Sequence, residues 1–96
     1  MTPTILNFGS INIDFIYRVS HFVCPGETLA CSSLDTVLGG KGANQSVAIA
    51  RAGARVKHIG RACKSDEWVF ALLEECGVDT SNVERANEAS GHAIIQ

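Results

Sequence analysis

Short apolar runs are spaced along the chain, and the periodicity of each run predicts the element that it forms. Residues 4–9 are apolar and β-prone and end at a Gly-Ser pair, which predicts a first strand. Residues 55–60 predict a second core strand. Between residues 65 and 77 the apolar positions recur at i, i+3, i+4 and i+7, which predicts an amphipathic helix facing a core. Those positions are Val69, Leu72, Leu73 and Cys76.

Two further segments favour a small β-layer beside this core. Residues 15–19 are extended and aromatic-rich, and residues 28–38 carry loosely alternating apolar residues. Pro25-Gly26 lies between them and is a strong turn signal, so the two segments are expected to pair antiparallel. Residues 91–96 begin another strand. Together they predict a flap over a site.

A small-residue segment at 44–52 predicts a helix that packs closely on its neighbours. Asn44 is expected to cap its start, and Gly53 to end it in the left-handed conformation. This helix lies between the two predicted core strands, so a parallel β–α–β unit with a right-handed connection is the default topology.

Composition and charge exclude several classes of function. The 96 residues fit one small globular domain, and a net charge of −2 with interleaved signs gives no basic stripe for nucleic acid. No apolar run approaches the roughly 20 residues of a membrane span, and the N-terminus lacks the features of a signal peptide, so a cytoplasmic protein is expected. The four cysteines form no CxxC pair, which predicts ordinary thiols and no metal site. The three histidines are scattered and indicate no chemistry.

The first candidate site follows the first strand. In an extended chain, Asn12 and Asp14 point to one side, and Ile11 and Ile13 point to the other. A carboxylate that accepts hydrogen bonds and an amide that donates and accepts them suit hydroxyl groups. The pair is also compatible with the exposed face of an ordinary strand. Its position beyond the carboxyl end of a strand favours a ligand site.

The second candidate is a glycine-rich loop in which Gly39, Gly40 and Gly42 surround Lys41. Glycines allow sharp bends and close approach to a ligand, and the helix behind the loop turns its positive end toward a polar or anionic guest. Neither common nucleotide loop is present. The pattern GxxxxGKS or GxxxxGKT fails because Lys41 is followed by Gly42, and GxGxxG fails because the third glycine is missing.

Three motifs, in their order and spacing, resemble the N-terminal third of ribokinase and the wider PfkB-type carbohydrate kinases. They are Gly-Ser-Ile-Asn-Ile-Asp at 9–14, Pro-Gly-Glu-Thr at 25–28 and Gly-Gly-Lys-Gly-Ala-Asn-Gln at 39–45. The resemblance implies a three-layer α/β fold with an antiparallel β lid. It also implies transfer of the γ-phosphoryl group of ATP to a hydroxyl of a sugar or nucleoside, with magnesium on the phosphates.

The resemblance also assigns roles by motif. Asn12 and Asp14 are expected to bind sugar hydroxyls, and Gly40, Lys41 and Asn44 to supply further sugar contacts. The lid comprises the segments at about 15–38 and 91–96, and in this family it often forms a homodimer contact. Residues 1–96 then make up an incomplete domain.

Two departures from the family pattern limit what is expected of the chain. Lys64-Ser65-Asp66-Glu67 stands where many relatives carry a Gly-Asp-Asp-x-x-Gly motif, which leaves the subfamily and the substrate open. The family's Gly-Ala-Gly-Asp motif, with its catalytic aspartate, and its ATP site have no counterpart here. No residue is therefore assigned to catalysis, cofactor or metal, and the chain alone is expected to be inactive. The alternative is a noncatalytic sugar-binding or dimerisation module derived from such a kinase.

Overall fold

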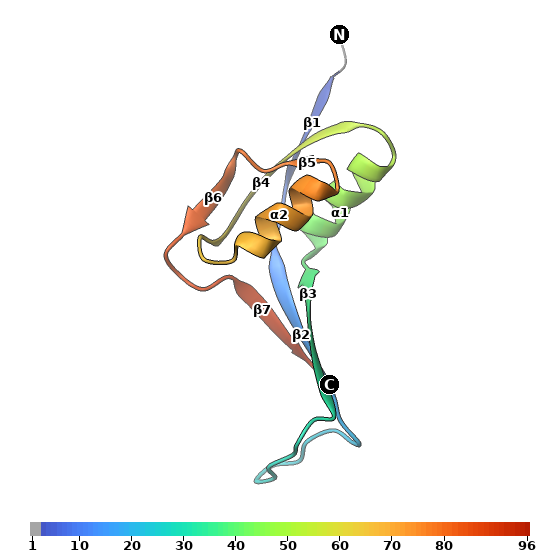
Figure 1. The fold of residues 1–96 in the computed structure, drawn as a ribbon, viewed down its shortest axis with the longest axis vertical. Coiled ribbons are helices and arrows are strands. Elements are labelled where there is room, and N and C mark those ends of the chain that lie inside the picture. The colour runs from blue at the N-terminus through green and yellow to red at the C-terminus, as the bar shows by residue number, and fades with distance from the viewer. Residues whose placement is uncertain (1–2) are drawn as a thin grey trace.

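Two β-sheets joined at one end form the scaffold of the structure, which is a computed structural model describing residues 3–96. One sheet carries both helices, and the other extends away from it as an arm (Figure 1). The molecule is accordingly elongated, with extents of 58 × 29 × 19 Å. The first sheet is called the body sheet below, and the second the arm sheet.

The body sheet contains four parallel strands, with β4 (Arg55–Cys63) at its centre. β4 pairs along its first half with β1 (Thr4–Phe8) on one side and β5 (Val78–Asp79) on the other, and its second half pairs with β6 (Val83–Ala86). The expected parallel pairing of the first two core strands is confirmed. The two later strands were not predicted, because they have only two and four residues and flank a polar turn.

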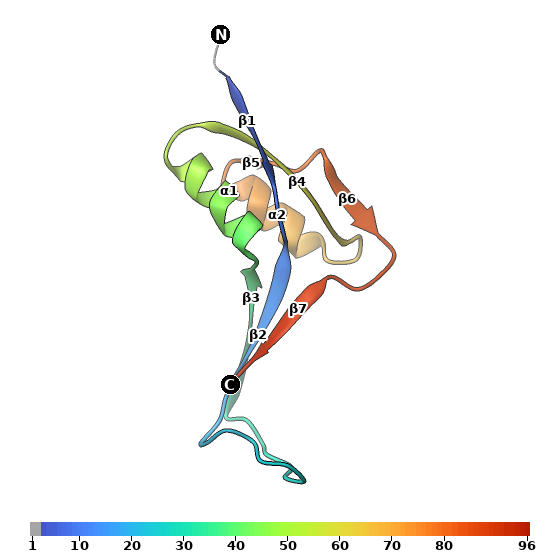
Figure 2. The same cartoon turned by 180° about the vertical axis from the view of Figure 1, so that it is seen from behind.

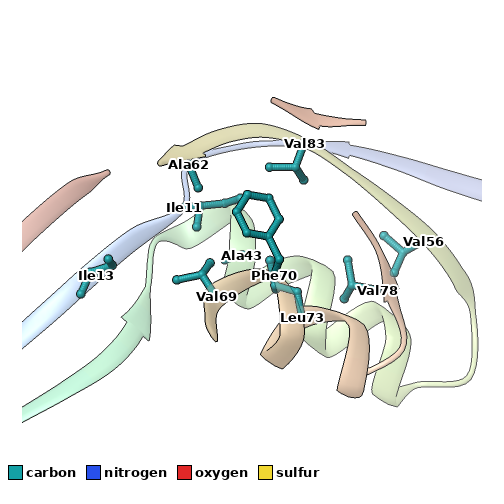
Figure 3. Close-up of a cluster of buried hydrophobic side chains, with 10 residues drawn as sticks. All are labelled: Ile11, Ile13, Ala43, Val56, Ala62, Val69, Phe70, Leu73, Val78 and Val83. Atoms are coloured by element: carbon teal, nitrogen blue, oxygen red, sulfur yellow. The ribbon is translucent and has the colours of Figure 1, made fainter. Parts of the chain in front are cut away.

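Helices α1 (Lys41–Arg51) and α2 (Glu67–Glu75) lie on the same face of the body sheet (Figures 1 and 2). The predicted amphipathic helix is confirmed as α2, because Val69 and Leu73 are fully buried while Leu72 and Cys76 are half-buried. Phe70 joins them between helix and sheet, together with Val56 and Val78 from β4 and β5 (Figure 3). The core thus lies on one side of the sheet only. The longer of the two helices, α1, has 11 residues. No helix within residues 3–96 is long and apolar enough to span a membrane.

The start of α1 differs from the prediction. Asn44 is not the cap, since the helix begins three residues earlier at Lys41 and its N-cap is Gly40. The positive φ of 97° at Gly40 breaks the preceding strand, so the chain is free to become helical at once. The expected end is confirmed: Gly53, with a φ of 94°, follows the C-cap residue Ala52.

The arm sheet has β2 (Asn12–Arg18) between β3 (Ser33–Gly39) and β7 (Gly91–Ile95). The expected antiparallel pairing of β2 with β3 is confirmed, and Pro25-Gly26 forms a turn in the loop that connects them. The expectation of a wholly antiparallel layer is wrong, because β7 runs parallel to β2. Both strands leave the body at the same end, with Asn12 beside Gly91, and therefore run outward together.

Candidate functional site

The two predicted site segments meet where the arm sheet joins the body. β2 begins at Asn12 and β3 ends at Gly39, and these two residues are direct partners in the antiparallel register. α1 begins two residues after Gly39. Residues 9–14 and 39–44 are called the junction below. Segments that are 25 or more residues apart in the sequence are therefore adjacent in the fold.

The strand geometry presents Asn12 and Asp14 together. Ile11 is 4% exposed and Ile13 is 6% exposed, so the isoleucines anchor this segment in the core. Asn12 and Asp14 are half-buried, and alternation along β2 places both side chains on the other face of the arm sheet. The expected division into one polar and one buried side is confirmed.

Two glycines on the neighbouring strands leave room for these polar side chains. A Cβ atom on Gly39 would lie 2.5 Å from the carboxylate atoms of Asp14, and one on Gly91 would lie 2.7 Å from Asn12 Oδ1. Any larger residue at either position would displace the polar group. The glycines thus allow the carboxylate and the amide to lie flat across the neighbouring strands.

The other two glycines of the loop pack against backbone atoms of the same chain. A Cβ atom on Gly40 would lie 2.6 Å from the carbonyl oxygen of Ser10 and 2.9 Å from the amide nitrogen of Asn12. A Cβ atom on Gly42 would lie 2.4 Å from Gly9 Cα. Of the three loop glycines, only Gly40 has a positive φ. Close backbone approach, more than sharp bending, accounts for the glycine content.

Lys41 and Asn44 lie on the first turn of α1, and both are exposed. Their spacing of three places them on the same side of the helix. The first turn contains no acidic residue, so the positive end of the helix dipole is not neutralised from within the helix. All five predicted site residues therefore lie at the junction. The pairing of β2 with β3 brings the segment that carries Asn12 and Asp14 next to Gly40.

The four polar site side chains are available for a ligand. Across residues 3–96, none of the side-chain hydrogen bonds or ion pairs involves Asn12, Asp14, Lys41 or Asn44. One carboxylate, two amides and one ammonium group provide acceptors and donors at the junction. Such a set can bind a polyol through several hydroxyl groups at once.

A buried polar cluster beside the junction was missed by the sequence prediction. Ser46 of α1 is hydrogen-bonded both to Asn7 of β1 and to His58 of β4. Ser46 and His58 are 0% exposed. The signal that could have indicated the cluster is register: Asn7 and His58 are paired positions of two parallel strands. His58 is therefore part of a buried polar network, although its position in the sequence indicates no such partners.

The residues present do not fit a magnesium–nucleotide site. Among residues 3–96 there is no group of three or more His, Cys, Asp and Glu side chains that could hold a metal ion. Gly40 and Gly42 pack directly on the backbone of Gly9, Ser10 and Asn12, so these two loop glycines contact the chain itself. Hydrogen bonds lower the pKa values of Glu27 and Asp79, and neither of these carboxyl groups belongs to the junction.

Several known proteins are similar to this chain in sequence and in structure. The sequence profile of the pfkB family carbohydrate kinases matches residues 2–95. A ribokinase of Haemophilus influenzae is 38% identical over 101 residues, which cover 100% of this chain and 32% of that protein.

Two similar solved structures are also ribokinases. One, from Cryptococcus neoformans var. grubii serotype A in complex with ADP, is 39% identical with a TM-score of 0.88 over 97% of this chain and 30% of that one. The other, from Arabidopsis thaliana and complexed with ribose and ATP, is 31% identical with a TM-score of 0.80 over 98% of this chain and 32% of that one. The chain thus spans about a third of the length of these relatives.

Proposed function

Because the chain belongs to the pfkB family of carbohydrate kinases and has a ribokinase-like α/β fold, we propose that it is the sugar-binding N-terminal part of a longer ATP-dependent kinase. The longer protein transfers the γ-phosphoryl group of ATP to a sugar hydroxyl. Residues 1–96 supply the socket for the acceptor sugar. D-Ribose is the proposed sugar, since the similar proteins described above are ribokinases.

The observation that carries this proposal is the pairing of Asn12 with Gly39 at the junction. It brings the Asn12–Asp14 segment beside the glycine loop and leaves the carboxylate and amide free of protein partners. In the proposed complex, Asp14 accepts hydrogen bonds from sugar hydroxyls, and Asn12 both donates and accepts. Gly40 contributes backbone, and Lys41 and Asn44 donate from the helix start.

ATP and magnesium are proposed to bind residues of the longer protein outside this chain. When bound, the magnesium nucleotide supplies the phosphoryl group, and the junction residues only bind and orient the acceptor. The 96-residue chain alone should therefore release no ADP when incubated with ATP, magnesium and D-ribose. A coupled ADP assay checks this, and ribose-dependent turnover by the short chain would contradict it.

The arm sheet is proposed to act as a lid over the sugar and as a homodimer contact. Both of its outer strands, β3 and β7, have an edge without a strand partner within residues 3–96. Apolar side chains are exposed on these strands, including Leu34 at 48% and Ile94 at 65%. Unpaired edges and apolar surface favour association with a second copy. A closed lid would exclude water from the phosphoryl acceptor.

Substitution of Asp14 in the full-length kinase tests the sugar site. Asp14→Ala removes a charged acceptor, so the Kd for D-ribose should rise roughly 10- to 100-fold, as for hydrogen bonds to charged groups. The Kd for ATP should stay nearly unchanged. Isothermal titration calorimetry measures both.

Asp35→Ala is the matched control, because Asp35 is an exposed carboxylate on the same arm sheet, in strand β3. It should leave both affinities intact. Equal losses of ribose and ATP binding in Asp14→Ala would refute the assignment of Asp14 to the sugar.

A further inference from the structure

We propose that the buried cluster of Asn7, Ser46 and His58 positions the sugar-binding junction, so that these three side chains set ribose affinity without touching the sugar. This inference rests on the proposed function above. It assigns a role to a fully buried histidine that the sugar site itself does not use.

The cluster forms a continuous hydrogen-bonded chain across three elements of the body. Asn7 Nδ2, from β1, donates to the carbonyl oxygen of Gly42 at 3.0 Å and to Ser46 Oγ at 2.9 Å. Ser46 Oγ, from α1, lies 2.7 Å from His58 Nδ1. His58 Nε2, from β4, lies 3.0 Å from the carbonyl oxygen of Gly9. The chain therefore begins and ends on backbone carbonyls of the junction.

The partners fix the direction of the bonds at both ends of the chain, and a neutral imidazole ring at His58 fixes the direction of the bond between Ser46 and His58. A carbonyl oxygen only accepts, so His58 Nε2 carries the proton that is donated to Gly9. His58 Nδ1 then accepts from the hydroxyl of Ser46, whose oxygen accepts from Asn7. Both hydrogens of the Asn7 amide are used. Within residues 3–96 no buried side-chain nitrogen or oxygen lacks a partner, so this cluster is fully satisfied.

The two carbonyls held by the cluster belong to a point where two segments of the backbone cross in close contact. Gly9 and Gly42 are in direct backbone contact there, with no room for a side chain on either. The amide of Ala43 donates to the carbonyl of Ser10 at 3.0 Å across the same crossing. The side-chain cluster and this backbone bond together fix how α1 lies against the turn after β1.

This crossing lies directly next to the sugar-binding residues. Asn12 follows Gly9 by three residues, and Gly40 precedes Gly42 by two. Gly40 also packs on the backbone of Ser10 and Asn12, so a shift of the crossing changes how Asn12 and Asp14 lie relative to Lys41 and Asn44. Misplacement of binding groups by about 1 Å can reduce reactivity by two orders of magnitude. A shift of this crossing, which does not itself touch the sugar, is therefore sufficient to alter ribose binding.

The test compares two variants of the full-length kinase. Ser46→Ala breaks the chain and leaves His58 Nδ1 without a donor, so the Kd for D-ribose should rise roughly tenfold, the equivalent of about 1.4 kcal/mol, and stability should fall. The double variant Ser46→Ala/His58→Phe removes both polar partners together. This variant has no unpaired histidine nitrogen, but one hydrogen of the Asn7 amide and the Gly9 carbonyl lose their partners, so stability should recover in part while ribose affinity stays low.

Thr80→Val is the control for a buried hydrogen bond elsewhere in the body. Thr80 is 8% exposed, follows β5 and donates at 2.7 Å to Glu74, near the C-terminal end of α2. This variant should lose stability and keep its ribose affinity. The Kd comes from calorimetry, and the free energy of unfolding comes from urea denaturation.

The outcomes separate this inference from the proposed function. If ribose affinity returns together with stability in the double variant, or if Ser46→Ala binds ribose normally, the positioning role is overturned. If Ser46→Ala does not fold, the ribose affinity of the double variant decides alone whether the cluster has the positioning role. Failure of the unaltered kinase to bind ribose would overturn the proposed function and this inference with it. The ring-nitrogen NMR signals of His58, which should report a proton on Nε2, test the cluster itself without any sugar.

Discussion

Gly42 lies in the first turn of α1, where helix propensity and packing have opposite effects. Alanine is favoured over glycine within a helix by about 1 kcal/mol, so propensity alone favours replacement. A Cβ atom there would lie 2.4 Å from Gly9 Cα and 2.6 Å from the Ser10 amide nitrogen. Backbone atoms cannot rotate away as a side chain does. Packing therefore outweighs propensity at this position.

We expect Gly42→Ala to lower the free energy of unfolding by about 1–3 kcal/mol, the range for overpacked sites. Ala48→Gly, at an exposed position of the same helix, is the control and should cost about 1 kcal/mol through propensity alone. Urea denaturation of both variants checks the pair. A Gly42→Ala protein as stable as the unaltered one would show that the crossing can separate without loss.

The sequence predicted which residues lie close together at the junction better than it predicted how they pack there. Asn12 and Asp14 follow from alternation along an extended chain, which is a local property. The need for glycine at Gly39 depends on Asp14, which is 25 positions away and in another strand. The same holds for His58, whose partners are Ser46 in α1 and Gly9, the residue that follows β1. Long-range contacts of this kind have no local signature in a single sequence.

The loop between β2 and β3 is held by one carboxylate. The His21 ring donates to the two oxygens of Glu27 at 3.0 and 2.9 Å, and the Cys24 amide donates to the same group at 3.1 Å. The bond from His21, and then the bond from Cys24, lower the pKa of Glu27 from its ordinary value of 4.5. Gly26, with a φ of 78°, completes the Pro-Gly turn inside this loop.

This loop should loosen in acid while the body stays folded. The pKa of Glu27 is lower in the folded loop than in the unfolded chain, so the stabilisation is complete above the ordinary value and is lost as pH falls through the lowered one. In an NMR titration, the Cys24 amide signal should move with a midpoint below 4.5. Glu27→Gln should abolish that movement. A midpoint at or above the ordinary value would contradict the account.

Elements were predicted well wherever a periodic pattern was long enough. Helix α2 and strands β1 and β4 each carry a clear apolar pattern, and the Pro-Gly turn is a local signal. The direction of β7 was not predictable in this way, because it depends on where the chain leaves the body at Gly91. The start of α1 was misplaced because Gly40, not Asn44, is the N-cap of the helix.

At the scale of the whole molecule, the body sheet is covered by helices on one face only. The side chain of Asn7 bonds to α1, so alternation along β1 directs Leu6 and Phe8 to the opposite face. Leu6 is 59% exposed and Phe8 is 73% exposed. We expect further segments of the longer kinase to cover this face, as its relatives are about three times as long.

Phe8→Ser should therefore have a different effect in each of the two forms of the protein. In the 96-residue chain it removes exposed apolar surface, so binding of the dye ANS should fall. In the full-length kinase it should lower the free energy of unfolding by about 1.5–3 kcal/mol, the value of burying one large apolar side chain. Dye fluorescence and urea denaturation measure the two effects. An unchanged stability of the long form would mean that this face stays open there as well.

The most direct test of the central proposal is a crystal structure of the full-length kinase with D-ribose bound. The account predicts sugar hydroxyl oxygens within about 2.6–3.2 Å of the Asp14 carboxylate and the Asn12 amide, with Lys41 or Asn44 on the same sugar. Ribose bound elsewhere, with Asp14 and Asn12 contacting only protein or solvent, would contradict it.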